Sequence, residues 1–342
     1  MNHCRTLVVV ALLALGGCKK QEPAPKADPA LASATTTVVS DAGAAAVTVD
    51  AGMSDAERVA KGMTDAETEA TKEKARWTPE LEKAALALRD KPFKTTTEAV
   101  TALLASEHRM PGHKDRDKDR HAAETLTFFG VKPTSTVVEV GAGGGWYTEL
   151  LAPLLANRGK LVVAGPDPAG PADKMMTVYG KRLDLFLAKS PLFGKVERVV
   201  IGTPVKLGAD GSADVVLAMR EMHNWQRRNE LDAYLTAIHA VLENGGILGI
   251  EQHRAAAGAK AEETAEKGYL PEEWVIEKVK AAGFELVEKS EINANPKDTK
   301  DYPKGVWTLP PNFREGETDR AKYAAIGESD RMTLKFKKVA KQ

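Results

Sequence analysis

Polar side chains gather just after two predicted strands, where they could transfer a proton or bind an anion. Histidine exchanges a proton near neutral pH, and arginine binds carboxylate and phosphate groups. Ligands of open α/β sheets bind beyond the carboxyl ends of the strands, so we expect these residues to share one crevice. A single histidine in such a place is more often structural than catalytic, but packing alone does not require several. The residues are Arg220, Glu221, His223, Asn224 and Trp225 after one strand, and Gln252, His253 and Arg254 after the other.

A glycine cluster at residues 141–145 follows Glu139 and precedes an apolar pattern at helical spacing. This order predicts a buried strand, a tight turn and a helix. Glycine accepts a positive φ and lets a ligand approach the main chain, although many α/β domains use it there only for close packing. The spacing Gly141-x-Gly143-x-Gly145 differs from the dinucleotide fingerprint G-x-G-x-x-G. It therefore suits a ligand without a pyrophosphate better.

Seven apolar runs, most of them separated by helical patterns, predict a doubly wound, mostly parallel α/β sheet. A long segment, residues 292–331, precedes the last of these runs. Loops of that length are often functional, so we expect it to fold back over the crevice as a lid that uses Asp298 and Trp307. The predicted strands are 137–140, 161–164, 196–201, 213–219, 246–251, 284–290 and 332–337, and the main helices between them are 172–188, 226–242 and 271–282.

The beginning of the chain resembles a bacterial lipoprotein signal. Its apolar run, residues 7–15, is shorter than the roughly 20 residues that span a bilayer. The ending Leu15-Gly16-Gly17-Cys18 resembles the lipobox, so we predict a signal peptide at 1–17 and acylation of Cys18. An ordinary signal peptide cut a little later is the alternative. We expect an exported protein held to the cell envelope only by its lipid, with the outer membrane favoured, and a disordered tether at 18–53.

Two charged segments precede the glycine cluster. Residues 54–106 are rich in alanine and charge and predict an N-terminal helical extension, whose packing on the rest of the chain stays open. Residues 107–121 are dense in charge, and their composition favours a solvated loop at the start of the main domain, 107–342. Lys+Arg and Asp+Glu both number 48, so the chain lacks the basic excess of a nucleic-acid-binding protein.

Several motifs resemble those of class I S-adenosylmethionine-dependent methyltransferases. Residues 139–145 match the first motif of that superfamily, and residues 210–216 and 242–248 look like later ones. More closely, the chain is similar, over roughly residues 109–337, to a family of exported bacterial proteins described as predicted methyltransferases. The resemblance implies a Rossmann-like fold with a seven-stranded sheet. The segments that carry the closer similarity are 120–133, 143–149, 223–225 and 293–301.

The resemblance also implies a cofactor and roles for residues. S-adenosylmethionine would donate a methyl group to a small-molecule or envelope-associated acceptor. His223 or His253 would be the general base, and Arg254 or Arg220 would bind an anionic acceptor. The residues expected on the donor are Glu139, Gly141, Gly143, Gly145, Trp146 and Asp167. Class I enzymes commonly place an acid for the ribose hydroxyls at the end of the second strand; here Gly165 has that place and Asp167 comes two residues later.

Two other functions compete with methyl transfer. The fold could have kept its crevice but lost the cofactor, which would leave a binding protein for an envelope metabolite. A metal-dependent hydrolase that uses His223, His253, Glu251 and Asp214 is disfavoured, because no pair of ligands has metal-binding spacing on one helix. We therefore predict no metal site.

Overall fold

The structure is a computed structural model, and it describes residues 53–339. The predicted signal peptide, Cys18 and nearly all of the tether lie outside the described residues. Within residues 53–339, no helix combines the length and the apolar character needed to cross a membrane.

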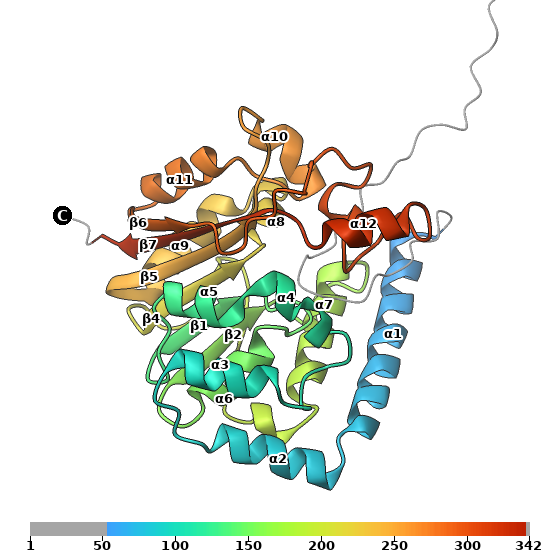
Figure 1. The fold of residues 1–342 in the computed structure, drawn as a ribbon, viewed down its shortest axis with the longest axis vertical. Coiled ribbons are helices and arrows are strands. Elements are labelled where there is room, and N and C mark those ends of the chain that lie inside the picture. Colours follow the sequence, from blue (N-terminus) through green and yellow to red (C-terminus); the bar gives the residue numbers. More distant parts are fainter. Residues whose placement is uncertain (1–52, 340–342) are drawn as a thin grey trace, which may run out of the picture. The chain divides into compact units, whose positions relative to one another are not determined.

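A seven-stranded sheet forms the centre of the described chain, as the sequence predicts (Figure 1). Its strand order is β3-β2-β1-β4-β5-β7-β6, with β7 antiparallel to both β5 and β6 and the other neighbours parallel. The carboxyl ends of β1, β2, β4 and β5 therefore share one edge, and the reversal of order beside β1 makes the switch point where ligands bind in such sheets. The strands are β1 Thr136–Val140, β2 Lys160–Gly165, β3 Glu197–Val200, β4 Ala213–Met219, β5 Leu242–His253, β6 Phe284–Ser290 and β7 Arg331–Lys338.

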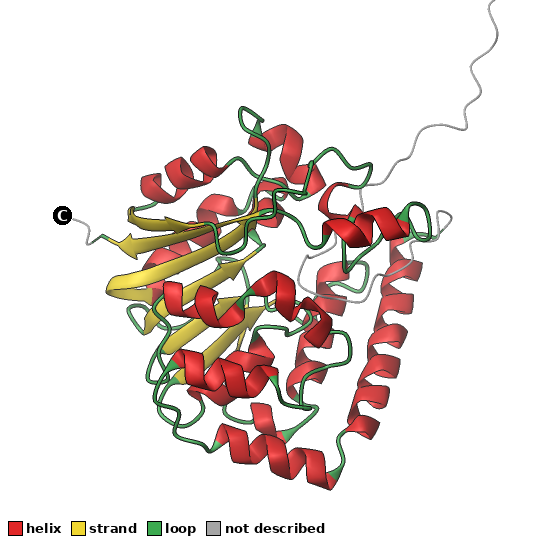
Figure 2. Cartoon of the chain, viewed as in Figure 1, coloured by secondary structure: helices red, strands yellow, loops and turns green. Residues whose placement is uncertain are grey.

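Helices cover both faces of the sheet, because alternate strand residues point to opposite sides (Figure 2). Val138 and Val140 pack with one helical layer, whereas Val137 packs with the other. The first layer contains α8 Met222–Arg227, α9 Leu231–Val241 and α11 Glu272–Ala281, and the second contains α3 Thr96–Leu104, α5 Ala122–Phe128, α6 Thr148–Leu155 and α7 Met175–Leu187.

The N-terminal helices belong to the same packed unit as the sheet. Helix α1 (Asp55–Arg76) lies along α7, and a Cβ on Gly62 would come 3.1 Å from a methyl group of Val178. Helix α2 (Pro79–Arg89) leads to Phe93 and α3, and Phe93 and Leu103 are buried in the core beneath β1. The packing of this extension, which the sequence leaves open, is thus against the domain.

The interpretation of residues 107–121 as a solvated loop is wrong. This segment forms η1 (Lys114–Arg116) and α4 (Asp117–Arg120), and it buries the side chains of Arg109 and Arg120 almost completely. These arginines are buried because they pair with the buried carboxylates of Glu149 and Glu328, which lie far away in the sequence. Composition shows how many charged residues a segment has, but not which oppositely charged side chains the fold brings next to them.

Smaller differences concern element boundaries. The single helix predicted at 226–242 is two helices, because Asn229 has a φ of 55° between them, and β5 begins already at Leu242. The long segment before β7 contains η4 (Gly305–Thr308) and α12 (Arg320–Ile326). The remaining short elements are η2 Pro191–Phe193, α10 Ala261–Thr264 and η3 Ala265–Lys267.

Candidate functional site

The glycine turn after β1 has the predicted conformation. Gly141, Gly143 and Gly145 have φ values of 70°, 54° and 80°, which other residues rarely adopt. A Cβ on Gly141 would lie 2.7 Å from the Glu221 carboxyl carbon, and one on Gly145 would lie 2.3 Å from the Phe186 ring. Both positions are therefore closely packed, but Gly141 also lines a hollow, together with Gly143, whereas Gly145 does not.

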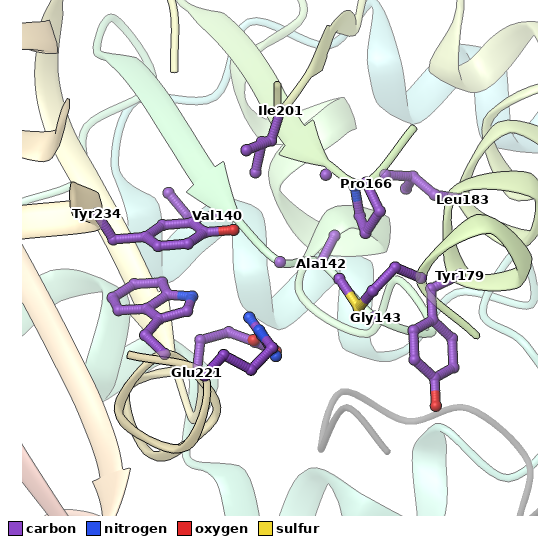
Figure 3. Close-up of a pocket in the computed structure, with 14 residues that line it drawn as sticks. Val140, Ala142, Gly143, Pro166, Tyr179, Leu183, Ile201, Glu221 and Tyr234 are labelled. Carbon is purple, nitrogen blue, oxygen red and sulfur yellow. The ribbon is translucent and has the colours of Figure 1, made fainter. Parts of the chain in front are cut away.

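This first hollow lies at the carboxyl ends of β1 and β2 and has a volume of about 460 Å³, its open mouth included. Figure 3 shows Tyr234 and Glu221 on one side of it and Ile201, Pro166 and Tyr179 on the other. The other lining residues are Val140, Gly141, Ala142, Gly143, Gly165, Met176, Leu183, Trp225 and Arg228.

The walls of the first hollow suit a flat apolar ring with a polar edge. The Trp225 and Tyr234 rings stack with centroids 4.4 Å apart, and glycine main chain forms part of the boundary. Glu221 is the carboxylate that lines the hollow. Asp167, predicted to bind the donor, is exposed and does not line it, because its Oδ1 accepts a hydrogen bond from the Ala169 main-chain N–H.

A second, smaller hollow lies on the other side of the turn and shares Gly141 and Ala142 with the first; its volume is about 230 Å³ with the open solvent at its mouth included. Glu139 lines this second hollow, where it accepts a hydrogen bond of 2.7 Å from the Thr148 hydroxyl. Burial raises the pKa of Glu139 to about 7 against the opposing effects of Thr148 and Arg220. The remaining lining residues are Arg120, Trp146, Tyr147, Met219 and Arg220.

Strand alternation explains the position of Glu139. Residues 137 and 139 point to one face of β1, and residues 138 and 140 point to the other. Val140 therefore lines the first hollow and Glu139 the second. Of the residues predicted on the donor, Glu139 and Trp146 thus line the second hollow together with Gly141, whereas Gly143 lines the first.

The two histidines predicted as general bases lie near each other but line neither hollow. Their ring centroids are 5.7 Å apart, and both are buried. His223 Nδ1 lies 3.3 Å from the side chain of Gln252, and His253 Nδ1 is hydrogen-bonded to the Ser329 hydroxyl. Trp307 packs against His223 from the long segment before β7, so this segment does fold back over the sheet edge.

Arg254 is not placed to bind an acceptor. Its guanidinium contacts three carboxylates, those of Glu272, Glu291 and Asp330, at 3.0, 2.5 and 3.0 Å. These partners raise the pKa of Arg254, with the hydrogen bond to Glu291 as the largest cause. Arg220, the alternative in the prediction, does line the second hollow and is 3% exposed.

Arg120 is the site residue that reasoning about roles missed. It is 1% exposed, lines the second hollow, and directs its Nε at both carboxylate oxygens of Glu328 at 3.3 Å. The available signal was its position at the start of a motif shared with the resembling family, residues 120–133. Glu328 lies more than 200 positions away, so no local pattern connects the two.

A further buried cluster supports the helix that follows the turn. The Glu149 carboxylate, in the first turn of α6, accepts from Arg109, His113, Lys189 and the Met110 main-chain N–H. Burial alone would raise the pKa of Glu149, but these partners outweigh it and lower the value to about 2. In the described part of the chain, no group of three or more His, Cys, Asp or Glu residues is arranged to hold a metal.

Comparisons with known proteins give solved structures only. No protein-family model matches the chain, and no curated protein matches it. A methyltransferase from Aquifex aeolicus, described as SAM-dependent, is 16% identical, with a TM-score of 0.44 over 71% of this chain and 98% of that one. A putative sarcosine dimethylglycine methyltransferase from Galdieria sulphuraria is 12% identical (TM-score 0.46; 76% and 98%), and the [4+2]-cyclase SpnF is 18% identical (0.44; 73% and 99%).

Proposed function

We propose that this protein is an S-adenosylmethionine-dependent methyltransferase of the cell envelope. The observation that carries the proposal is the first hollow, where Gly141 and Gly143 offer bare main chain at the switch point of the sheet. The sequence resemblance to class I methyltransferases points to the same turn. Export and attachment through Cys18 are part of the proposal and rest on the sequence.

The residues present fit the donor in part. The stacked pair Trp225 and Tyr234 suits its adenine ring, and the glycine main chain allows close approach of its remainder. The carboxylate expected at the end of β2 is absent, since Gly165 stands there and Asp167 faces solvent. Glu221 is the acid placed in the hollow, and we assign to it the contact with the ribose hydroxyls.

Once bound, S-adenosylmethionine would supply an electrophilic methyl group on its sulfonium. The chain positions the acceptor and removes its proton. Glu139 suits the second task, because its pKa of about 7 lets it gain and lose a proton near neutral pH, and it lines the hollow that adjoins the donor site. We therefore assign the general base to Glu139 in preference to His223 or His253.

Calorimetric titration of the full chain in detergent with S-adenosylhomocysteine tests the proposal. We expect micromolar binding, about 8 kcal/mol. Gly143→Ala should weaken it, because the new Cβ stands on main chain that lines the hollow. Gly211→Ala is the matched control, since Gly211 has a similar φ of 66° but no atom within 4 Å of the added carbon. Absence of binding to the unaltered chain at millimolar ligand would refute the proposal.

The second candidate function is that of a binding protein for an envelope metabolite that has lost the cofactor. The replacement of the expected ribose-binding acid by Gly165 favours it. This candidate predicts no measurable affinity for S-adenosylhomocysteine, so the same titration separates the two functions. The hollow at the switch point is nevertheless lined by Gly141 and Gly143, and we therefore favour the methyltransferase.

A further inference from the structure

The second hollow is bordered by an unusual concentration of buried arginine. Arg120 and Arg220 both line it, and each guanidinium packs on an aromatic ring of the same hollow. The Arg120 guanidinium carbon lies 4.8 Å from the Trp146 ring centre, and that of Arg220 lies 5.9 Å from the Tyr147 ring centre. The two side chains are thus fixed in place by packing as well as by ion pairs.

Positive charge exceeds negative charge among the ion pairs behind this hollow. Glu328 pairs with Arg116, Arg120 and Arg331, and Glu251 pairs with Arg220 and Arg331. Four guanidinium groups therefore share two carboxylates, and every one of these residues is less than 8% exposed.

Asp117 lies near Arg120 but pairs with Arg109, and two further acids lie close to this cluster. Asp119 is at its partly exposed edge, where its main-chain oxygen accepts from Arg331, and burial raises the pKa of its carboxyl. Glu139 also has a raised pKa and is only partly ionised near neutral pH. Neither carboxylate forms an ion pair with the four arginines in the described structure, so the excess positive charge remains next to the hollow.

Each lining arginine also has a buried N–H group without an acceptor. Arg120 Nη2 and Arg220 Nε are both buried and find no hydrogen-bond partner among the described residues. Such groups are costly to bury, because a charged donor that loses water and gains no acceptor pays its full desolvation penalty. An oxyanion bound between the two side chains would offer acceptors to such donors, since carboxylate and phosphate accept strong charge-assisted hydrogen bonds from guanidinium N–H groups.

We propose that the Arg120–Arg220 hollow binds the carboxylate or phosphate group of the methyl acceptor, so that the acceptor is a small anionic molecule. That the bound molecule is a methyl acceptor rests on the proposed function, whereas the existence of an anion site does not. The hollow shares Gly141 and Ala142 with the donor hollow, so an anion held there places the rest of its molecule beside the turn. Glu139 lies in the same hollow and can take the proton of the reacting group.

The experiment uses inorganic phosphate as the probe, with the full chain at constant ionic strength set by chloride. The measured quantity is the thermal midpoint of unfolding as phosphate rises through the low millimolar range. We expect a saturable rise for the unaltered protein. Arg120→Lys and Arg220→Lys keep the positive charge beside Glu328 and Glu251 but remove the fork, so each should weaken phosphate about tenfold or more.

Arg182→Lys is the matched control. Arg182, on α7, also has buried N–H groups without an acceptor, at Nε and Nη1, but it lines neither hollow. Its replacement should leave the phosphate response unchanged. Equal responses in all four proteins would overturn the proposal, because they would show a general salt effect. A lysine variant that fails to fold is replaced by the other, since both arginines face the same hollow.

A second arm separates the acceptor from the donor's own carboxylate. If the anion belongs to the acceptor, phosphate should still stabilise the protein saturated with S-adenosylhomocysteine, and Arg120→Lys should bind S-adenosylhomocysteine normally. Competition between phosphate and S-adenosylhomocysteine would overturn the assignment to the acceptor. The assignment would also be overturned if Arg120→Lys bound S-adenosylhomocysteine more weakly but bound 5′-methylthioadenosine, which lacks the carboxylate, as tightly as the unaltered protein does. Failure of S-adenosylhomocysteine to bind at all would refute the methyltransferase and leave the phosphate arm as a separate test of the anion site.

Discussion

Replacing Glu139 and Glu149 by glutamine should change the stability of this protein in opposite directions. Both carboxyls are buried, at 3% and 0% exposed, and they lie on either side of the glycine turn. The pKa of Glu139 rises from 4.5 to about 7, and that of Glu149 falls from 4.5 to about 2. Glutamine resembles a protonated glutamate in size and shape, so each variant approximates the wild-type protein with that carboxyl held neutral.

The sign of each effect follows from the difference between folded and unfolded pKa. A raised pKa means that the folded state resists ionisation, so Glu139 lowers stability once pH exceeds its unfolded value. A lowered pKa means that the folded state favours the ion, so Glu149 adds stability above pH 4.5 that is lost as pH falls toward 2. Since one pKa unit corresponds to about 1.4 kcal/mol, each effect reaches about 3 kcal/mol at pH 8.

Urea unfolding at pH 8 and at pH 5 measures both effects. At pH 8 we expect Glu139→Gln to unfold with a free energy about 3 kcal/mol higher than wild type, and Glu149→Gln about 3 kcal/mol lower. At pH 5 the gain of Glu139→Gln should shrink to about 1 kcal/mol, whereas the loss of Glu149→Gln should stay near 3 kcal/mol. A destabilised Glu139→Gln at pH 8 would refute the reasoning, because it would show that the ionised form of Glu139 is favoured by the fold.

Two further predictions concern the turn and the long segment before β7. Gly145→Ala should lower the free energy of unfolding by about 3 kcal/mol, because alanine is strained at this positive φ and its Cβ would collide with Phe186. Gly316→Ala should lower it by only about 1 kcal/mol, because its φ is also positive but nothing lies within 4 Å of the added carbon. Equal losses of stability in thermal unfolding would contradict this prediction. Asp298→Asn should cost about 2 kcal/mol, because the buried carboxylate accepts from the Tyr269 hydroxyl and from two main-chain N–H groups. An unchanged urea midpoint for Asp298→Asn would contradict this, because it would show that these hydrogen bonds do not stabilise the fold.

Local sequence patterns predicted the fold well because most strands of the sheet are short apolar runs. The central strands of a doubly wound sheet are buried on both faces, so their residues are mostly apolar and their ends are marked by turns, whereas the edge strands β3 and β6 are more exposed. The glycine turn was predictable for the same reason, since positive φ at Gly141, Gly143 and Gly145 depends on the chain's own backbone. The break at Asn229 was not, because asparagine accepts both helical and left-handed conformations.

The candidate site was predicted less well because its side chains depend on distant partners. His223 and Arg254 do follow strand ends, and His253 is the last residue of β5. Arg254, however, is held by Glu272, Glu291 and Asp330, and the histidines line neither hollow. The position of Glu139 could have been predicted from strand alternation, which puts it opposite Val140. The role of Arg120 could not, since its burial depends on Glu328 from the far end of the chain.

Buried ion pairs such as those of Arg120 and Arg220 contribute little to the stability of a fold, so their presence calls for another explanation. The cost of removing charges from water often equals or exceeds their mutual attraction, and apolar residues of similar volume would commonly hold a core as well. Arg120 and Arg220 moreover keep donors without acceptors, which worsens that balance. A cluster that is expensive for the fold and borders the glycine turn is better explained by an anionic group that it binds than by packing. Trp146, which follows the glycine turn, contacts the guanidinium groups of both Arg109 and Arg120, so its ring joins the turn to both charged clusters.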